Sequence, residues 1–421
     1  MTNLEYLFHL EHHGIKLGLD NIRTLLAAAG NPHRAFPSVH VAGTNGKGSV
    51  VAMVAAVAGA AGYKVARFTS PHLIDIAERF TIASENITHA ELDAQVGFFR
   101  RVAEAMPNPP TFFELTTAVA FRWFAQSGVN LAVVEVGMGG RLDSTNVLKP
   151  IVAAITTIDF DHMKYLGDTL EKIAFEKAGI IKPRTPVVAG ERKPGPLDVL
   201  IGRARQMRSP LSLIGRDFTF ATSGTPFQIE FEYHSPGLSI GPTPLGLTGS
   251  YQGENAAVAV AAAERLHRSL PRIDKAAIER GLADAHWPCR MEKVLDNPPV
   301  IIDAAHNPAG AQKVAPGLAN CITVLAMAAD KDAQGAIQAL APATKLFIFT
   351  RFEGSRSTPP EHLANSAGSL PCQIEPSLEA ALATGMSLAT KDSPLLITGS
   401  IFTAGQARQI LIDRYGAAGL Q

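Results

Sequence analysis

Short apolar runs alternate with helix-forming segments through the first half of the chain. Mostly apolar runs of strand length stand at Ser38–Ala42, Val65–Phe68, Leu131–Val136 and Ile151–Ile158, and the last two are nearly continuous. Segments with helix-forming composition lie between them, at Val50–Ala61, Glu91–Glu104 and Glu114–Gln126. Strands that lack polar alternation are typical of a parallel sheet, because helices cover both of its faces. The pattern therefore predicts an α/β domain with a mostly parallel sheet.

The residue composition changes between Ser209 and Ser250, where Gly, Pro, Ser and Thr become frequent. Within this region, Phe227–Tyr233 alternates apolar and polar residues with a period of two. That alternation predicts a half-buried antiparallel strand, and so a small antiparallel β segment inserted in the domain. Helical patterns then resume at Asn255–Leu270 and Asp274–Ala283.

A second alternation of strands and helices begins after a stretch that breaks regular structure. Trp287-Pro288 and Asn297-Pro298-Pro299 interrupt the pattern between Ala285 and Pro299. Later strands are expected at Val300–Asp303, Ile322–Met327, Leu346–Thr350 and Leu395–Thr398. A chain of 421 residues has room for two or three domains of ordinary size. We therefore expect two domains, 1–285 and 286–421, the second a smaller Rossmann-like α/β domain.

Composition and charge narrow the class of protein. The 38 basic and 38 acidic residues balance, so no global field draws the chain to nucleic acid or to an anionic membrane. Three cysteines without a Cys-x-x-Cys pair disfavour both a disulfide framework and a thiolate zinc site. The first residues lack the basic segment of a signal peptide, and Val50–Gly62 is too short to span a bilayer. These features predict a cytoplasmic protein.

The most informative stretch follows the strand at Ser38–Ala42 and leads into a helix. Its loop is the run Gly43, Thr44, Asn45, Gly46, Lys47, Gly48 and Ser49. Glycines let backbone N–H groups turn toward phosphate oxygens, and a helix N-terminus adds further donors. The general phosphate-loop pattern needs Ser or Thr directly after the lysine, where this chain has Gly48. The alternative is a tight turn with an exposed lysine.

Acidic and polar side chains follow the other predicted strands. Glu135 ends its strand just before a glycine-rich turn, and Asp161 and His162 follow the next one. Ligands of open α/β sheets bind at the carboxyl ends of the strands, so Glu135 is placed to meet Mg²⁺ bound to phosphates. A solvated glutamate is the alternative for Glu135. His162 is an unusual ligand for Mg²⁺, and a structural or solvated histidine is the commoner case.

Composition alone gives two further segments no special function. Lys177 lies on a predicted helix, where a lysine usually belongs to a solvated face. In the second domain, the strand at Val300–Asp303 runs into a polar loop that contains His306 and Asn307. For Asn307, which precedes a proline, the commoner role is that of a helix N-cap.

Several motifs in one order resemble the folylpolyglutamate synthase family, which is sister to the Mur ligases. The resemblance covers nearly the whole chain, and its Gly-Thr-Asn-Gly-Lys-Gly-Ser run explains the departure from the general phosphate loop. The matching segments are Leu17–Asp20, Gly43–Ser49, Ser70–His72, Glu135–Gly140, Asp161–His162, Glu176–Gly179, Tyr251–Gln252 with Asn255, Arg290–Glu292, Asp303–Pro308, Lys331–Asp332 and Thr398–Ser400.

The resemblance implies an ATP-dependent ligase with a Mur-ligase-like N-terminal P-loop domain, a Rossmann-like C-terminal domain and ATP between them. It implies an acyl-phosphate intermediate that the amine of L-glutamate attacks. Lys47 and its loop would hold the phosphates. The remaining positions would be Mg²⁺ ligands (Ser70, Glu135, His162), a carbamylated lysine (Lys177), ATP contacts (Asn255, Arg290, Asp303) and the glutamate side (His306, Ser400). His306 is also our hypothesis for the general base.

Within the family, the chain looks most like the bifunctional bacterial enzymes, which also make dihydrofolate from dihydropteroate. Thr111, Phe113 and Asp143 match residues on their pterin side, where Phe can stack on a flat ring and Asp can accept from N–H groups. Substrates would be dihydropteroate, folates, L-glutamate and ATP, with a monovalent cation as a further cofactor candidate. We expect a monomer that binds neither nucleic acid nor membrane.

Three alternatives stay open at this point. They are a monofunctional folylpolyglutamate synthase, a Mur-type peptide ligase, and an inactive nucleotide-binding regulator. The intact Lys47, Glu135 and His162 argue against the regulator. Two positions depart from the family: Cys289 stands where Gly is usual, and Ala304 stands where Gly is frequent. Both are small residues, so close approach of the backbone is still possible there.

Overall fold

The computed structural model describes residues 1–417 of the chain. It divides into two compact units. The first contains 1–221, 231–243 and 253–285, and the second contains 222–230, 244–252 and the chain from His286 onward.

An eight-stranded sheet forms the centre of the first unit. Its strands lie in the order β4-β3-β2-β5-β1-β6-β7-β8. All neighbours pair in parallel except β2 with β3 and β3 with β4. The strands are β1 Ser38–Ala42, β2 Val65–Phe68, β3 Phe80–Ile82, β4 Glu85–Asn86, β5 Leu131–Glu135, β6 Val152–Ile155, β7 Val187–Ala189 and β8 Leu211–Leu213. The mostly parallel sheet expected from the apolar runs is confirmed.

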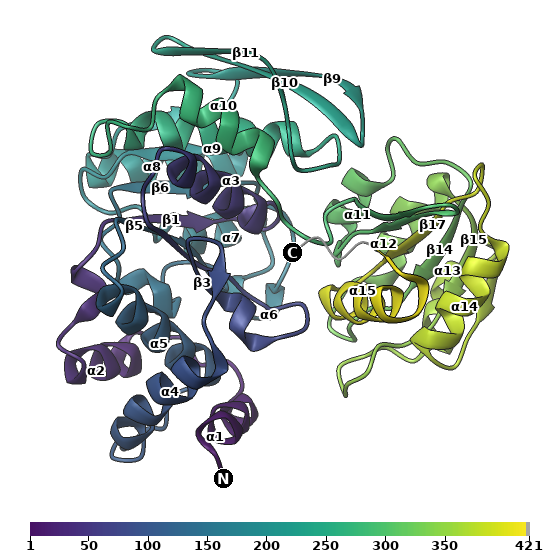
Figure 1. Cartoon of the computed structure of the whole chain (residues 1–421), viewed down its shortest axis with the longest axis horizontal. Helices are drawn as coiled ribbons and strands as arrows, with labels where there is room; N and C mark the ends of the chain where they lie inside the picture. The colour runs from purple at the N-terminus through teal and green to yellow at the C-terminus, as the bar shows by residue number, and fades with distance from the viewer. Residues whose placement is uncertain (418–421) are drawn as a thin grey trace. The chain divides into compact units, whose positions relative to one another are not determined.

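Helices cover both faces of this sheet, as Figure 1 shows. On one face lie α3 (Lys47–Ala60), α9 (Gln252–Leu266) and α10 (Lys275–Asp284). Helix α3 is apolar nearly all round and correspondingly buried. A Cβ at Gly281 would overlap the backbone of α3 at Val57, so glycine permits the close packing of α10 on α3.

The opposite face carries the remaining helices of this unit. One cluster joins α2, α4 and α5 to β2 and β5, and contains Phe68, Phe99 and Phe121. A second cluster joins α7 and α8 to β6 and β7. The helices are α1 Asn3–His9, α2 Asp20–Ala28, α4 His89–Ala103, α5 Phe112–Gln126, α6 Met163–Leu166, α7 Leu170–Ala178 and α8 Pro194–Met207.

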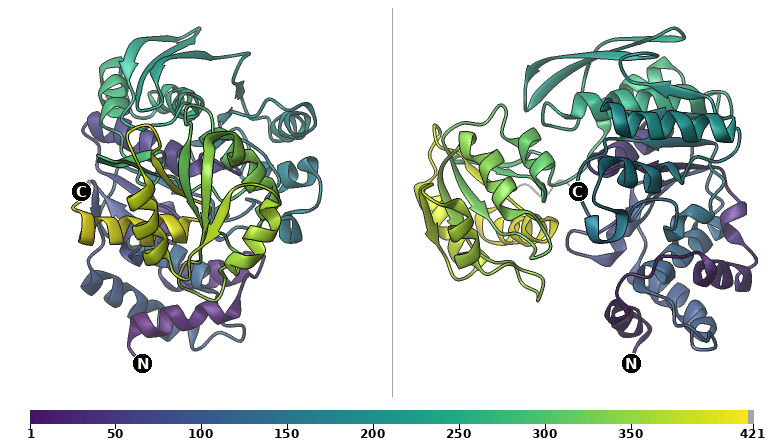
Figure 2. Two further views of the ribbon diagram at one scale, coloured as in Figure 1. Left: turned by 90° about the vertical axis from the view of Figure 1, so that its right-hand side faces the viewer. Right: turned by 180° about the vertical axis from the view of Figure 1, so that it is seen from behind.

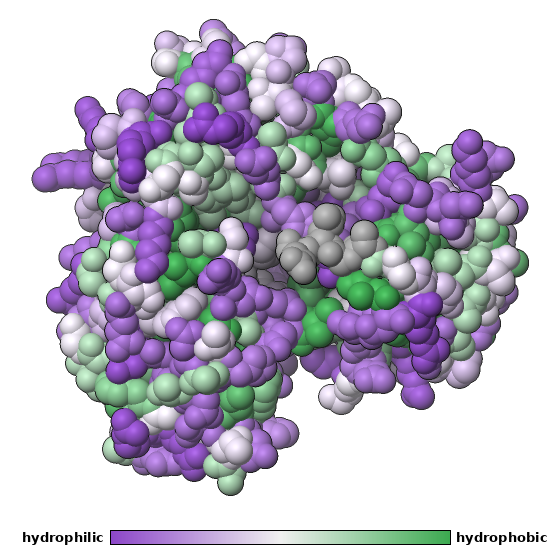
Figure 3. Space-filling model, viewed as in Figure 1, coloured by the Kyte–Doolittle hydropathy of each residue, from purple (hydrophilic) through white to green (hydrophobic). Residues whose placement is uncertain are grey.

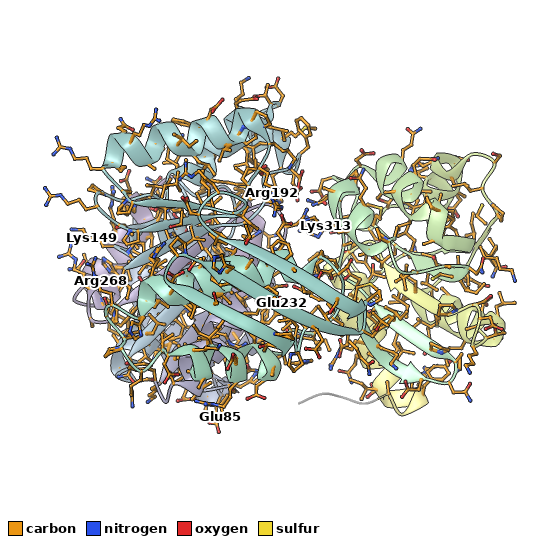
Figure 4. The ribbon with its side chains drawn as sticks, turned by 90° about the horizontal axis from the view of Figure 1, so that it is seen from above. Glu85, Lys149, Arg192, Glu232, Arg268 and Lys313 are labelled. Carbon is orange, nitrogen blue, oxygen red and sulfur yellow. The ribbon has the colours of Figure 1, made fainter. Side chains whose placement is uncertain are left out.

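A three-stranded sheet in the order β11-β10-β9 follows this domain's parallel strands in sequence. Its strands, β9 (Thr219–Thr225), β10 (Gln228–Ser235) and β11 (Leu238–Pro244), are joined by two residues each, which makes them consecutive hairpins. Exposed and buried residues alternate strictly along β10, as the period of two predicted. Glu232, labelled in Figure 4, is one of its exposed residues.

The second unit has a six-stranded sheet of order β12-β13-β17-β14-β15-β16. The left panel of Figure 2 shows this unit in front. Only β12 with β13 pairs antiparallel. The strands are β12 Glu292–Asp296, β13 Pro299–Ile302, β14 Cys321–Leu325, β15 Thr344–Phe349, β16 Cys372–Ile374 and β17 Leu395–Thr398. The helices are α11 Pro308–Val314, α12 Ala333–Leu340, α13 Pro360–Ala367, α14 Leu378–Leu388 and α15 Ile401–Tyr415. The second α/β domain is thereby confirmed.

The expected interruption between Ala285 and Pro299 is wrong in its second half. Strand β12 lies there, and Asn297-Pro298 forms the turn of the hairpin that joins it to β13. Asn297-Pro298 therefore ends strand β12 and lies inside a hairpin of the second unit.

Apolar and polar residues are interspersed over the face in Figure 3. Within residues 1–417, none of the helices combines the length and hydrophobicity that a membrane span requires.

Candidate active site

The glycine loop joins the carboxyl end of β1 to the N-terminus of α3. Gly43 and Gly46 both have positive φ angles, 153° and 85°. A Cβ at Gly43 would overlap Thr156 Oγ1, and one at Gly46 would overlap Asn255 Oδ1. Both positions therefore require glycine, and Gly46 sets Asn255 of α9 directly against the loop.

The end of β6 holds this loop in place. Thr44 N–H donates to Thr157 O at 2.7 Å, and Thr156 Oγ1 donates to Asn45 O at 2.6 Å. Sequence reasoning missed both threonines, although two hydroxyls directly after an apolar strand were a usable signal. Ser49 Oγ is buried without a hydrogen-bond partner, which suits a phosphate or metal-bound ligand.

Lys47 lies between the loop and the carboxyl end of β5. Its Nζ donates to the carbonyl oxygens of Gly43 and Thr44 at 3.2 and 3.1 Å, and lies 3.9 Å from Glu135 Oε1. Glu135 Oε2 in turn accepts from Ser70 N–H at 3.1 Å. The structure therefore brings a cation, a carboxylate and a serine together at one edge of the sheet.

This oxygen-rich set fits Mg²⁺. A hard cation that keeps several waters needs only one or two carboxylates besides phosphate oxygens, and the Glu135 carboxylate beside Ser70 is compatible with that requirement. Across residues 1–417, no three His, Cys, Asp or Glu side chains gather closely enough to form a metal site by themselves. His162 lies at the start of α6 with φ 50°, and its N–H donates to Asp161 Oδ1.

Lys177 is buried at the end of α7, with only 4% of its surface exposed, so the solvated-face interpretation is wrong. Its Nζ donates to Gly43 O at 2.9 Å. Burial and the neighbouring Lys47 lower its pKa to about 7, against the opposing effect of nearby aspartates. A substantial fraction of this amine is therefore neutral near pH 7.

On the expected pterin side, Phe113 packs against the turn after β5. Its ring centroid lies 5.9 Å from that of Phe68. A Cβ at Gly137 would approach Phe113 Cζ to 2.5 Å, so the glycine makes room for the ring. Gly137 is two residues from Glu135, which places this aromatic side chain near the carboxylate.

Thr111 and Asp143 both cap helices. Thr111 Oγ1 accepts from Glu114 N–H in a capping box at the start of α5. Asp143 Oδ1 accepts from Thr145 N–H, and Oδ2 accepts from Met138 N–H. Burial raises the pKa of the Asp143 carboxyl against these hydrogen bonds. Both side chains are therefore already engaged by the protein, and their assignment to a pterin side stays a prediction.

In the second unit, Asp303 forms hydrogen bonds to the segment that contains Arg290, which the resemblance assigns to ATP contacts. Its Oδ2 accepts from Tyr251 OH at 2.6 Å and from Met291 N–H at 2.9 Å. Burial raises the pKa of this carboxyl, while Arg290 acts in the opposite direction. Cys289 has φ 55°, a conformation that favours glycine, which accounts for the residue usual in the family.

The expected glutamate-side residues also lie in the second unit. His306 Nδ1 is 3.1 Å from Ala304 O, and Ser400 caps α15 by accepting from Phe402 N–H. Gly399 N–H donates to Ala305 O at 3.0 Å, which brings the two loops together. Asn307 is the N-cap of α11, as its position before proline predicted.

Replacing Gly46 with alanine is expected to raise the KM for ATP at least about tenfold, because the new Cβ displaces Asn255 and strains a left-handed backbone. Steady-state kinetics at saturating second substrates would measure this. Gly59→Ala in the same helix is the control, since nothing lies within 4 Å of a Cβ there. Unchanged ATP kinetics in Gly46→Ala would contradict the assignment of the loop.

Comparison with known proteins agrees with this geometry. Residues 41–263 match the Mur ligase middle domain, and residues 289–401 match the Mur ligase glutamate ligase domain. The dihydrofolate synthase/folylpolyglutamate synthase of Bacillus subtilis (strain 168) is 36% identical over 358 residues, which cover 82% of this chain and 83% of that protein.

Solved structures give the same result. The folylpolyglutamate synthase of Mycobacterium tuberculosis complexed with ADP has 33% identity and a TM-score of 0.90, covering 97% of this chain and 98% of its own. Escherichia coli FolC in complex with DHPP and ADP has 28% identity and a TM-score of 0.89, covering 99% of both chains. The chain therefore belongs to the folylpolyglutamate synthase family, of the bifunctional bacterial type, as its motifs indicated.

Proposed function

We propose that this chain ligates L-glutamate to dihydropteroate, giving dihydrofolate, and to tetrahydrofolates, giving folylpolyglutamates, at the expense of ATP. One observation supports a folate as the substrate. The segment Glu135–Met138 touches the nucleotide loop through Lys47 and the pterin-side residues through Phe113 and Asp143. A folate bound against Phe113 would then lie beside the phosphates held at Lys47.

In the first step, a carboxylate oxygen of the folate substrate attacks the γ-phosphorus of ATP. The bond from that phosphorus to the β–γ bridging oxygen breaks, and ADP leaves. Lys47 neutralises charge on the transferred group, and such reactions depend mainly on positioning and electrostatics. Mg²⁺ held by Ser70 and Glu135, with His162 as a further ligand, would supply additional positive charge to the phosphates.

In the second step, the amine of L-glutamate attacks the acyl carbon. The amide bond forms, the carbon–oxygen bond to phosphate breaks, and inorganic phosphate leaves. The attacking ammonium must first lose a proton, and His306 is our candidate for the base. The acyl phosphate must be protected from water, which would otherwise hydrolyse it.

Several finer proposals accompany this function, and the function does not depend on them. We propose that Lys177 is carbamylated, because its neutral amine can attack CO₂ and lose a proton, leaving an anion beside Lys47. A monovalent cation is a further cofactor candidate. Balanced charge supports small-molecule ligands over nucleic acid or membrane, and three free cysteines support a cytoplasmic location. That the protein is a monomer is an expectation from the family resemblance alone.

Purified protein supplied with dihydropteroate, ATP and L-glutamate is expected to release phosphate only when all three are present. Chelation of divalent cations should stop the release. The same assay with tetrahydrofolate in place of dihydropteroate separates a bifunctional enzyme from a monofunctional folylpolyglutamate synthase. Phosphate release without glutamate, or none with either pterin, would contradict the proposal.

A further inference from the structure

Arg79 is a buried cation in the first unit to which no role has been assigned. It ends the 3₁₀ helix Ile76–Arg79, and only 7% of its surface is exposed. Its Nε donates to His72 Nδ1 at 2.9 Å, and its guanidinium carbon lies 5.1 Å from the ring centroid of Phe112. Among residues 1–417, no carboxylate lies within ion-pair distance of this guanidinium.

Three carboxylates favour the charged form of Arg79 without pairing with it directly, and Glu11 has the largest effect of the three. Glu11 is exposed to solvent, Glu135 accepts from Ser70 N–H, and Glu78 accepts from the backbone N–H groups of the turn 73–75. Burial lowers the pKa of Arg79 to about 10, and these acids only partly offset that effect. A buried charge without a direct partner is costly, and such groups are commonly retained for function.

The position of Arg79 links the two halves of the proposed site. His72, which accepts from its Nε, is two residues from Ser70 on the metal side. Phe112, which stacks against its guanidinium, precedes Phe113 on the pterin side. The reacting carboxylate of dihydropteroate is at the opposite end of the molecule from the pterin, and it must approach the phosphates. It would therefore lie between these two groups of residues.

We propose that Arg79 binds the reacting carboxylate of the folate substrate through its terminal guanidinium nitrogens and aims that carboxylate at the γ-phosphate. This inference rests on the proposed function. His72 is a positioning residue, since accepting from Nε leaves the two Nη groups to form the planar fork that carboxylates bind. The substrate anion then supplies the partner that the buried cation lacks.

The test compares a pterin ligand that ends in a carboxylate with the same ligand ending in a carboxamide. With ADP present and without turnover, wild-type protein is expected to bind the acid about 10–100-fold more tightly than the amide, the range for a hydrogen bond between charged groups. In Arg79→Met, the two ligands should bind within about threefold of each other. The KM for ATP should stay close to that of wild type.

Arg122→Met is the matched control. Arg122 is also partly buried against a phenylalanine, with its guanidinium carbon 4.0 Å from the Phe98 ring centroid, and it hydrogen-bonds Gln95. Losing this contact is expected to lower the Tm but to leave the preference for the acid intact. An Arg79→Met protein that still prefers the acid as strongly as wild type would overturn the proposal.

Two further measurements cover a failure of Arg79→Met to fold. Arg79→Lys keeps the charge without the fork, so its preference for the acid should fall below wild type without vanishing. On wild-type protein, the acid should shift the NMR resonance of the Arg79 guanidinium Nε–H clearly more than the amide does, a readout that does not need Arg79 to be accessible to a reagent. Equal shifts with both ligands would overturn the inference. Because these readouts need no turnover, they are distinct from a failure of the phosphate-release assay.

Discussion

Lys47→Ala is expected to lower kcat by about 10²–10³-fold, the range for removing one preorganised group that stabilises transition-state charge. Lys47 Nζ lies 3.9 Å from Glu135 Oε1 and within hydrogen-bond reach of the loop carbonyls, so its loss removes a positive charge directly from the nucleotide loop. The variant should stay folded, because this side chain is partly exposed and packs little of the core. Initial rates of phosphate release, with circular dichroism as a check on folding, would measure the effect.

Lys64→Ala is the control for this variant. Lys64 is an exposed lysine shortly after α3, and its Nζ donates to Ser127 O. Its loss should leave kcat within about twofold of wild type, as for most surface substitutions. Retention of most of the activity in Lys47→Ala would count against the nucleotide site described here.

Lys177→Ala is expected to lower kcat by a comparable factor, about 10²-fold or more, because the carbamate anion that we propose on Lys177 would be lost beside Lys47. In wild-type protein incubated with ¹³CO₂, NMR should show one carbamate carbon that Lys177→Ala lacks. Carbamate forms only from the neutral amine. With a pKa of about 7, its occupancy at fixed dissolved CO₂ should rise as the pH increases from 6 to 8.

Lys172→Ala provides the matched control on the same helix. Lys172 is exposed, and its Nζ pairs with Asp168 at 2.7 Å on the surface of the protein. Neither the carbamate signal nor kcat should change appreciably in this variant. A carbamate signal that persists in Lys177→Ala would assign the modification to another amine, and full activity there would show that the carbamate is dispensable.

The parallel sheet could be predicted because its strands are mostly apolar and do not alternate with polar residues. Strands β1, β2 and β17 begin and end where the apolar runs predicted. Helix starts were placed late: α3 begins at Lys47 instead of Val50, and α5 at Phe112 instead of Glu114. Helix α3 starts with Lys-Gly-Ser, so its apolar pattern begins only after the first turn. The start of α5 is marked instead by the capping box of Thr111 and Glu114, a local signal that the apolar pattern does not carry.

Strand β12 was missed because prolines flank it, and the local signal for a break outweighed the signal of a short strand.

The residues of the candidate site also differ in how well the sequence predicts them. Lys47 and Glu135 could be found because each stands at the end of a strand in a recognisable motif. Arg79 could not, since an arginine beside Glu78 looks like part of a solvated turn, whereas in the fold it is buried and contacts His72 and Phe112 of a distant helix. Long-range packing of that kind leaves no local pattern.

The central claim is that a folate carboxylate is activated by ATP before glutamate attacks. Dihydropteroate carrying ¹⁸O in both carboxylate oxygens, incubated with ATP and L-glutamate, tests it by mass spectrometry of the phosphate released. An acyl-phosphate route predicts one ¹⁸O in inorganic phosphate for each dihydrofolate formed. Dihydrofolate formation with unlabelled phosphate would contradict the account.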